Sequence, residues 1–323
     1  MEETARLLDL FEVEGVGAIL HSFRPVTPED FHPELCRFLM GKRNGDNVRL
    51  FLKVGADLNH LVGGHTPLVR AICACNMEAF QMIVEDRGVD LEVRAGAAFE
   101  DSSRHVLAVM KGDTAVMAAC RQGRWPMVPV LVAKGADVEA RDAVGQHALQ
   151  IACKVAETEL RRSRMNPAAH HSAICKTLRC LVTKTSYLHG IRVYVDGLTR
   201  PLLHFFTWCG FADLVEVLLS KDIDVNTTDW GGSRALEIAV KRSNCKIVQL
   251  LINKGANVNV QVSGGFTVLH LAVFLRNVEI VKLLLEGGAN KEIRDSEKKT
   301  PREKAEARGY HEIVALLDAP GTC

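Results

Sequence analysis

The sequence is poor in aromatic residues and has almost no net charge. Phe, Trp and Tyr make up 6% of the 323 residues, although 47% are hydrophobic, and this balance favours closely packed helices over a β-sandwich. The 40 basic and 39 acidic residues leave a net charge of +1, so no overall field indicates nucleic acid or an anionic membrane as the partner. No hydrophobic run approaches the roughly 20 residues that span a bilayer. The composition, with 10 prolines and 25 glycines, is typical of a soluble globular protein.

The amino-terminal residues lack the features of a secretory signal. Met1 to Arg6 are acidic rather than basic, and they lead into an amphipathic stretch. We therefore expect a protein inside the cell, either cytoplasmic or nuclear. In that environment the ten cysteines are expected to be reduced thiols rather than a disulfide framework.

Motifs of common catalytic sites are also missing from the sequence. It contains no phosphate-binding loop, dinucleotide fingerprint, nucleophile elbow or His-Glu-x-x-His helix. His171, Cys175 and Cys180 are close in sequence, but the paired Cys-x-x-Cys spacing of most zinc sites is absent. We expect neither enzymatic activity nor a bound metal or cofactor.

A motif recurs along the chain with a period of 33 residues. Thr267–Ala272 begins 33 residues after Arg234–Ala239, and His147 follows Thr114 at the same distance. The Gly-Ala-Asp or Gly-Ala-Asn endings of the units are Gly55–Asp57, Gly135–Asp137, Gly255–Asn257 and Gly288–Asn290. A threonine can cap the start of a helix, and a glycine can end one in the left-handed conformation. A single unit cannot bury its apolar side, whereas stacked units form a continuous core.

The period and these motifs resemble the ankyrin repeat family. Eight positions match its helix starts, namely Pro33, Thr66, Thr114, His147, Pro201, Arg234, Thr267 and Thr300. The resemblance implies an all-α solenoid of about eight stacked helix pairs with β-turn fingers. It also implies that His204 and His270 brace the threonine-containing turns and link neighbouring units. We assign residues 1–32 to an N-terminal helical cap, 33–299 to the repeat array, and 300–323 to a C-terminal capping repeat and tail.

Two insertions interrupt the repeat pattern. The first, near residues 94–111, is expected to lengthen a finger and is interpreted either as a tolerated loop or as a functional one. The second, near 155–176, is expected to extend one helix beyond Lys154 and to begin another near Ala168. Its basic residues, which suit an acidic or phosphate-bearing partner, are Arg161, Arg162, Arg164, Lys176 and Arg179. A solvated extension without function is the alternative interpretation.

The resemblance places partners in a concave groove formed by the fingers and the ends of the first helices. The residues of this chain at those positions that we single out are Trp208, Phe274, Leu275, Trp230, Phe266, Lys241, Arg242 and Arg121. Tryptophan and arginine often dominate interface energies. Packing between adjacent units is the alternative role for Trp208 and Phe274.

We therefore predict a non-enzymatic, monomeric interaction module, an adaptor, scaffold or inhibitor, that binds a protein along the concave face. The aromatic residues beside Lys241 and Arg242 suggest a partner with an apolar anchor and acidic flanks. The alternative is a nucleic-acid or acidic-lipid contact through the basic insertion at residues 154–184. By the same resemblance, Asn59, Asn226 and Asn259 match finger positions that asparaginyl hydroxylases modify in some family members.

Overall fold

The computed structural model describes residues 48–49, 52–53, 56–101, 106–162, 167–195 and 198–319. The predicted N-terminal cap at residues 1–32 and most of the first predicted repeat lie outside these ranges. The chain divides into two compact units, residues 1–147 and 148–323. Each unit is treated by itself below.

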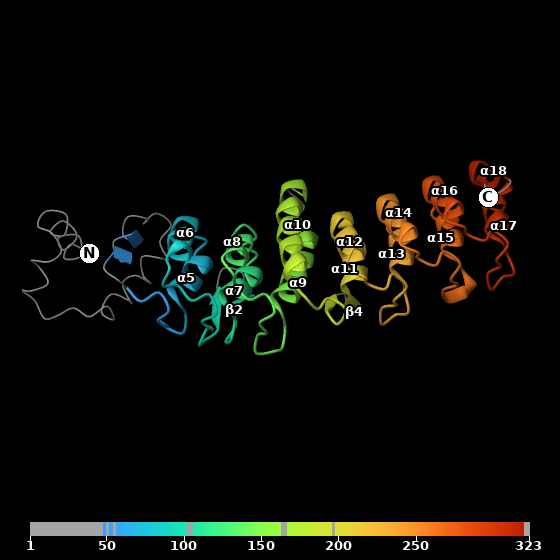
Figure 1. Ribbon diagram of the computed structural model, residues 1–323. Helices are drawn as coiled ribbons and strands as arrows, with labels where there is room; N and C mark the ends of the chain where they lie inside the picture. The colour runs from blue at the N-terminus through green and yellow to red at the C-terminus, as the bar shows by residue number, and fades with distance from the viewer. Residues whose placement is uncertain are drawn as a thin grey trace, which may run out of the picture. The chain divides into compact units, whose positions relative to one another are not determined.

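The first unit contains two described helix pairs and one hairpin (Figure 1). The helices are α5 (Pro67–Cys73), α6 (Met77–Glu85), α7 (Ala115–Arg121) and α8 (Met127–Ala133). Between the pairs, β1 (Phe99–Asp101) runs antiparallel to β2 (Val106–Val109). This hairpin coincides with the first insertion, which therefore lengthens a finger as expected.

The second unit contains five helix pairs in sequence order. They are α9 (Ala148–Arg162) with α10 (Pro167–Lys184), α11 (Leu202–Cys209) with α12 (Ala212–Leu219), α13 (Ala235–Lys241) with α14 (Cys245–Asn253), α15 (Val268–Phe274) with α16 (Val278–Glu286), and α17 (Pro301–Glu306) with α18 (His311–Asp318). Each helix of a pair contacts its partner, and from α11 onward each helix also contacts its equivalent in the next pair. A finger before α11 contains the antiparallel strands β3 (Arg192–Val195) and β4 (Leu198–Pro201), and the finger before α15 includes a short 3-10 helix, η2 (Ser263–Gly265). Within this unit the fingers extend from the same ends of the helix pairs (Figure 1).

Local sequence explains where the helices begin. The Thr267 hydroxyl accepts a hydrogen bond from the backbone N–H of His270 at the start of α15, and Thr300 caps α17 in the same way through Glu303. The second helices α6, α14 and α16 begin after Asn76, Asn244 and Asn277, whose side chains accept the N–H three residues later. Helix α9 continues to Arg162 and α10 begins at Pro167. This agrees with the predicted extension and with the second helix expected near Ala168.

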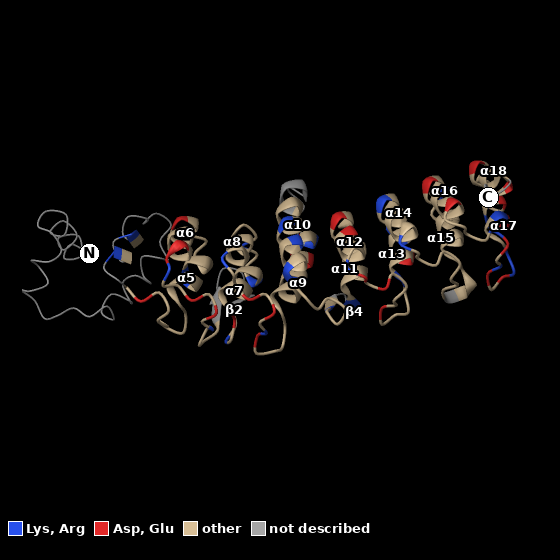
Figure 2. Ribbon diagram, viewed as in Figure 1, with Lys and Arg blue, Asp and Glu red and all other residues tan. Residues whose placement is uncertain are grey.

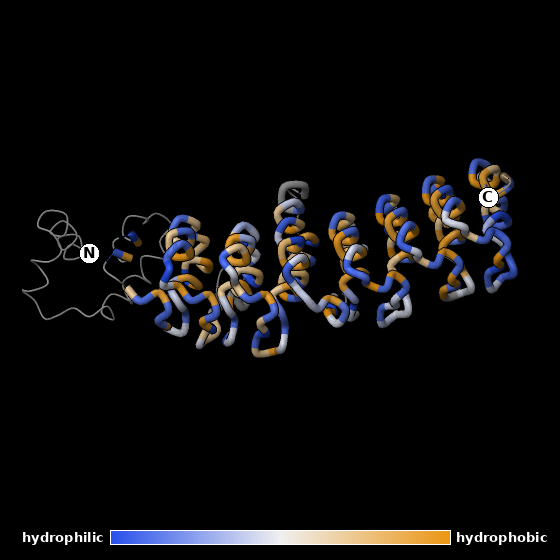
Figure 3. Tube along the Cα trace, in the orientation of Figure 1, coloured by the Kyte–Doolittle hydropathy of each residue, from blue (hydrophilic) through white to orange (hydrophobic). Residues whose placement is uncertain are grey.

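Apolar side chains between the helices form the core of each unit. The rings of Phe205, Phe206 and Phe211 are fully buried together in α11 and at the start of α12. Leu251 in α14 and Leu284 in α16 are also fully buried. Hydrophobic residues are frequent on the helices, and the fingers contain both hydrophobic and hydrophilic stretches (Figure 3). None of the described helices is long and apolar enough to cross a membrane.

Two histidines link successive repeats as the sequence predicted. The Nε2 of His204 donates to the Ser233 carbonyl at 3.1 Å, and that of His270 donates to the Lys299 carbonyl at the same distance. Each bond joins a first helix to a residue 29 positions later, just before the next first helix. Burial lowers the pKa of both histidines, so both braces use the neutral ring.

Candidate protein-binding surface

A row of exposed and half-buried side chains follows the ends of the first helices in the second unit. We call this row the first-helix stripe and define it as Trp208, Arg242, Phe274, Leu275 and Arg308. Trp208 and Phe274 occupy equivalent positions two repeats apart, as do Arg242 and Arg308. Because α11, α13, α15 and α17 contact one another in that order, their ends form one continuous surface.

Trp208 lies at the centre of a group of arginines. The guanidinium carbons of Arg242, Arg161 and Arg200 lie 4.6, 5.3 and 5.6 Å from the centroid of its ring. These distances are typical of cation–π contacts. The indole is therefore only partly exposed, and both of the roles considered for it, local packing and partner binding, remain compatible with its position.

Phe274 and Leu275 form an open apolar patch at the end of α15. Their exposed fractions are 57% and 39%. The guanidinium carbon of Arg308 lies 4.7 Å from the Phe274 centroid, which leaves much of the ring accessible. Large apolar side chains that are exposed next to each other often mark an interaction surface.

The other predicted contact residues of this unit are placed differently. The Lys241 ammonium forms an ion pair at 2.5 Å with the buried carboxylate of Glu237. Phe266 is half-buried, packs edge-on against His270 and lies beneath the Lys304 ammonium. Trp230 is 81% exposed at the tip of the finger between α12 and α13, and so it is accessible but separate from the stripe.

Arg121 has a structural role, and its predicted part in partner binding stays a prediction. Its guanidinium lies 2.9 Å from the carboxylates of both Asp113 and Asp142, whose side chains are completely buried. Burial alone lowers the pKa of an arginine, but the bonds to these two carboxylates raise the pKa of Arg121 overall. The two aspartates come from successive fingers, so Arg121 joins those fingers together. Sequence spacing does not reveal this ion pair.

The described basic residues of the insertion are placed differently from one another. Arg161 pairs with Glu157 on the same helix and also approaches Trp208, while Lys176 and Arg179 are exposed on α10. Arg164 and the Arg162 side chain lie outside the described part of the chain. Basic residues appear at several places along α9 and α10 (Figure 2).

The cysteine and histidine of this insertion form a local contact. The Cys175 Sγ lies 3.6 Å from the His171 Nδ1 on α10. Burial raises the pKa of the Cys175 thiol to about 11, so the sulfur stays protonated and is a poor nucleophile. Within the ranges that the structure describes, no group of three or more His, Cys, Asp or Glu residues is arranged to hold a metal.

Asn59, Asn226 and Asn259 connect neighbouring fingers. Each amide nitrogen donates to a glycine carbonyl 29 residues later, at Gly88, Gly255 and Gly288 respectively. The amide oxygen of each asparagine accepts a hydrogen bond from the backbone N–H of the residue two positions after that glycine, namely Asp90, Asn257 and Asn290. The three asparagines therefore have a structural role, and their predicted hydroxylation stays a prediction.

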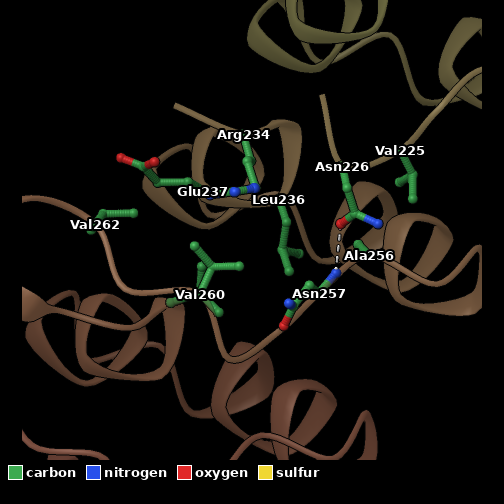
Figure 4. Close-up of a pocket in the computed structure, with 10 residues that line it drawn as sticks. Val225, Asn226, Arg234, Leu236, Glu237, Ala256, Asn257, Val260 and Val262 are labelled. Carbon is green, nitrogen blue, oxygen red and sulfur yellow. Dashed lines mark hydrogen bonds between the residues drawn. The ribbon is translucent and has the colours of Figure 1, made fainter. Parts of the chain in front are cut away.

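A small hollow lies between two fingers near the middle of the second unit (Figure 4). Its cavity volume is about 10 Å³, about the space that one water molecule needs and far below that of small-molecule sites. Its lining residues are Val225, Asn226, Arg234, Leu236, Glu237, Ala256, Asn257, Val260, Val262 and Val268. The bond between Asn226 and Asn257 crosses one side of it. The hollow is too small to indicate a substrate site.

Arg200 and Arg308 are not among the residues that the sequence predicts for this surface. The signal for Arg308 is nevertheless in the sequence, because it follows Phe274 at the same interval, 34 residues, that separates Arg242 from Trp208. Arg200 precedes α11 on β4. Asp196-Gly197 between β3 and β4 is a sequence signal for the hairpin, but the approach of Arg200 to Trp208 is a contact between segments that no motif predicts.

Comparison with known proteins agrees with this architecture. A family model for three copies of the ankyrin repeat matches residues 168–262 and 236–321, and a model for a single ankyrin repeat matches residues 111–143. Among solved structures, the ankyrin repeat domain of Bcl-3, described as a unique member of the IkappaB protein family, is 24% identical with a TM-score of 0.50. That match covers 79% of this chain and 99% of the other, and it supports the fold alone. Ankyrin repeats are generally protein–protein interaction modules without enzymatic activity. The family models cover more than half of the sequence, and the chain belongs to the ankyrin repeat family.

Proposed function

We propose that this protein is a non-enzymatic adaptor, scaffold or inhibitor that binds a protein partner along the first-helix stripe. The observation that carries the proposal is the open apolar patch of Phe274 and Leu275, with Arg308 stacked on the phenylalanine ring. The core does not require these side chains to be large and apolar. Burying them against a partner gives a favourable hydrophobic contribution to binding.

The repeat scaffold favours binding because it holds the contact residues in place before the partner arrives. The stripe residues stand at the ends of α11, α13, α15 and α17, and successive helices of this series pack against each other. Little conformational entropy is then lost when the complex forms. The resulting mechanism is recognition by a preorganised surface, with no chemical step.

Affinity capture from native lysate tests this function. The protein is compared with a Phe274→Ser/Leu275→Ser variant and with a Tyr194→Ser control, which removes an aromatic side chain that is 63% exposed on β3. We expect proteins captured by the wild type to be lost with the double variant and kept with the control. Retention of every captured protein by a correctly folded double variant would contradict the proposal.

Binding of nucleic acid or acidic lipid through the basic insertion is the weaker candidate. The pairing of Arg161 with Glu157 reduces the charge that this segment can offer. Lys176 and Arg179 remain exposed and carry this alternative. Its test is binding to oligouridylate and to phosphatidylserine vesicles, compared between the wild type and Lys176→Gln/Arg179→Gln.

A further inference from the structure

The first-helix stripe repeats a specific contact between neighbouring repeats. Arg242 stacks on the Trp208 ring of the preceding repeat at 4.6 Å, and Arg308 stacks on the Phe274 ring of its preceding repeat at 4.7 Å. In both cases the arginine follows the aromatic residue by 34 positions. The two contacts are equivalent in the repeat, but their surroundings differ.

The Trp208 end of the stripe has an excess of positive charge. Of the three guanidiniums around the indole, Arg161 is paired with Glu157. Arg200 and Arg242 form no ion pair with any residue in the described part of the chain. The buried Nε of Arg200 also has no hydrogen-bond partner within that part. Two positive charges are therefore left uncompensated beside a half-buried ring.

Stacking makes these arginines good receptors for carboxylates. A guanidinium lying against a ring keeps its N–H groups at the edge, where they can donate two parallel bonds to one carboxylate. The ring also restricts the side chain, so less entropy is lost when such bonds form. Arg200 is half-buried, which reduces the screening by water that weakens exposed ion pairs, whereas Arg242 is exposed.

The Phe274 end of the stripe is apolar instead. Phe274 and Leu275 are adjacent and open to solvent, and a single arginine, Arg308, contacts the phenylalanine ring among the described residues. A large aliphatic or aromatic side chain fits this patch best. The two ends of the stripe therefore favour different kinds of residue.

We propose that the stripe binds an acidic segment of a partner protein, with Asp or Glu side chains at Arg200 and Arg242 and a large apolar side chain on Phe274 and Leu275. This inference rests on the proposed function and specifies the chemistry of the partner. Packed helices lie about 8–10 Å apart, so the two ends, two repeats apart, are separated by about 16–20 Å. An extended peptide advances roughly 3.3 Å per residue. An acidic residue at Arg242, one repeat from Phe274, is then about three positions from the apolar residue, and one at Arg200, two repeats away, is about five or six positions from it.

Charge complementarity and the apolar patch together favour this occupant over single-stranded RNA. RNA-binding surfaces combine a basic groove with ring faces on which bases stack. The Trp208 ring is already in contact with three guanidiniums, which leaves Phe274 as the accessible ring of the stripe. One open ring beside an aliphatic side chain suits a protein anchor better than a series of bases.

Selection from a phage-displayed library of random 16-residue peptides, with the full chain as bait, tests the proposal. We expect the enriched peptides to contain acidic residues separated by about three to six positions from a large apolar residue. Their dissociation constants are then measured by fluorescence anisotropy at about 50 and 200 mM salt. Arg200→Gln/Arg242→Gln should weaken binding at least about tenfold at low salt and flatten the salt dependence. Phe274→Ser/Leu275→Ser should weaken binding by a similar factor at both salt concentrations.

Matched variants separate these effects from a loss of folding. Lys282→Gln removes an exposed cation from the second helix α16 and should leave affinity unchanged. Arg242→Lys keeps the charge without the planar stacked group and should give an intermediate affinity. Unchanged far-ultraviolet circular dichroism and melting temperature establish that each variant is folded.

The outcomes distinguish the partner chemistry from the proposed function. Enriched peptides without acidic residues that still require Phe274 and Leu275 would overturn the acidic specificity and leave the stripe as the binding surface. Enriched peptides that depend on neither end, or a failure to enrich any, would overturn this proposal, and capture from lysate would then decide the function separately. Tighter binding of a 12-nucleotide oligouridylate with the same dependence on Arg200 and Arg242 would assign the site to RNA.

Discussion

At the scale of single residues, Arg121 shows how a charged side chain can be essential to the fold rather than to binding. It satisfies two fully buried carboxylates at once. Replacing Arg121 by Met would leave both charges without their counter-ion, so we expect the free energy of unfolding to fall by about 3–5 kcal/mol. Urea denaturation followed by circular dichroism measures this change. Lys134→Ala, an exposed lysine of the same unit, should have little effect, and equal stability of both variants would refute the structural role.

The buried histidines make stability depend on pH. Burial holds the pKa of His204 and His270 below the ordinary value of 6.5. Their folded forms therefore bind protons less readily than the unfolded chain, and stability present above pH 6.5 is lost as the pH falls toward the folded pKa values. We expect the free energy of unfolding to decrease between pH 7 and pH 5. His204→Gln/His270→Gln should flatten that decrease, whereas His311→Gln, at an exposed position, should not. An unchanged slope in the double variant would contradict this account.

At the scale of structural elements, the start of α13 departs from the rule that its neighbours follow. Arg234 stands where Thr267 and Thr300 cap α15 and α17, and its side chain makes no capping bond. Glu237 stands where His204 and His270 form their braces. Restoring both with Arg234→Thr/Glu237→His should add a helix cap and a hydrogen bond to the next finger. We expect the free energy of unfolding to rise by about 1–2 kcal/mol, measured by chemical denaturation. A decrease in the free energy of unfolding would indicate that the Glu237–Lys241 ion pair stabilises the protein more than the added cap and hydrogen bond do.

The elements of this fold differ in how far the sequence predicts them. Local signals are sufficient for the helices, because caps such as Thr267 and the 33-residue period depend only on nearby residues. The β3–β4 hairpin is not among the predicted elements, although its two strands are separated by Asp196-Gly197, a dipeptide typical of two-residue hairpin turns. The sequence placed the candidate contact residues but not their partners: Phe274 and Leu275 are open, whereas Arg121 is paired with two aspartates and Trp208 is surrounded by arginines. Those differences arise from contacts between segments that are distant in sequence.

At the scale of the whole molecule, a repeat architecture limits how far a local defect spreads. Stability in such arrays is approximately a sum of repeat terms and nearest-neighbour interface terms. Leu251 is fully buried in α14, which contacts α12 and α16, and Leu251→Ala should cost about 2–5 kcal/mol. Native-state hydrogen exchange should then show lost protection in α12 to α16 and nearly unchanged protection in α7 and α8 of the first unit.

Hydrogen exchange of this variant also tests partner binding, because the residues of the first-helix stripe come from the successive repeats on both sides of α14. A local opening there would separate the Trp208 end from the Phe274 end, and a ligand that contacts both ends should oppose it. We expect a selected stripe-binding peptide at saturating concentration to restore protection in α12 to α16 of Leu251→Ala. A peptide that needs only one end should restore less. Equal loss of protection in both units, or no recovery with the peptide, would argue against a surface maintained repeat by repeat.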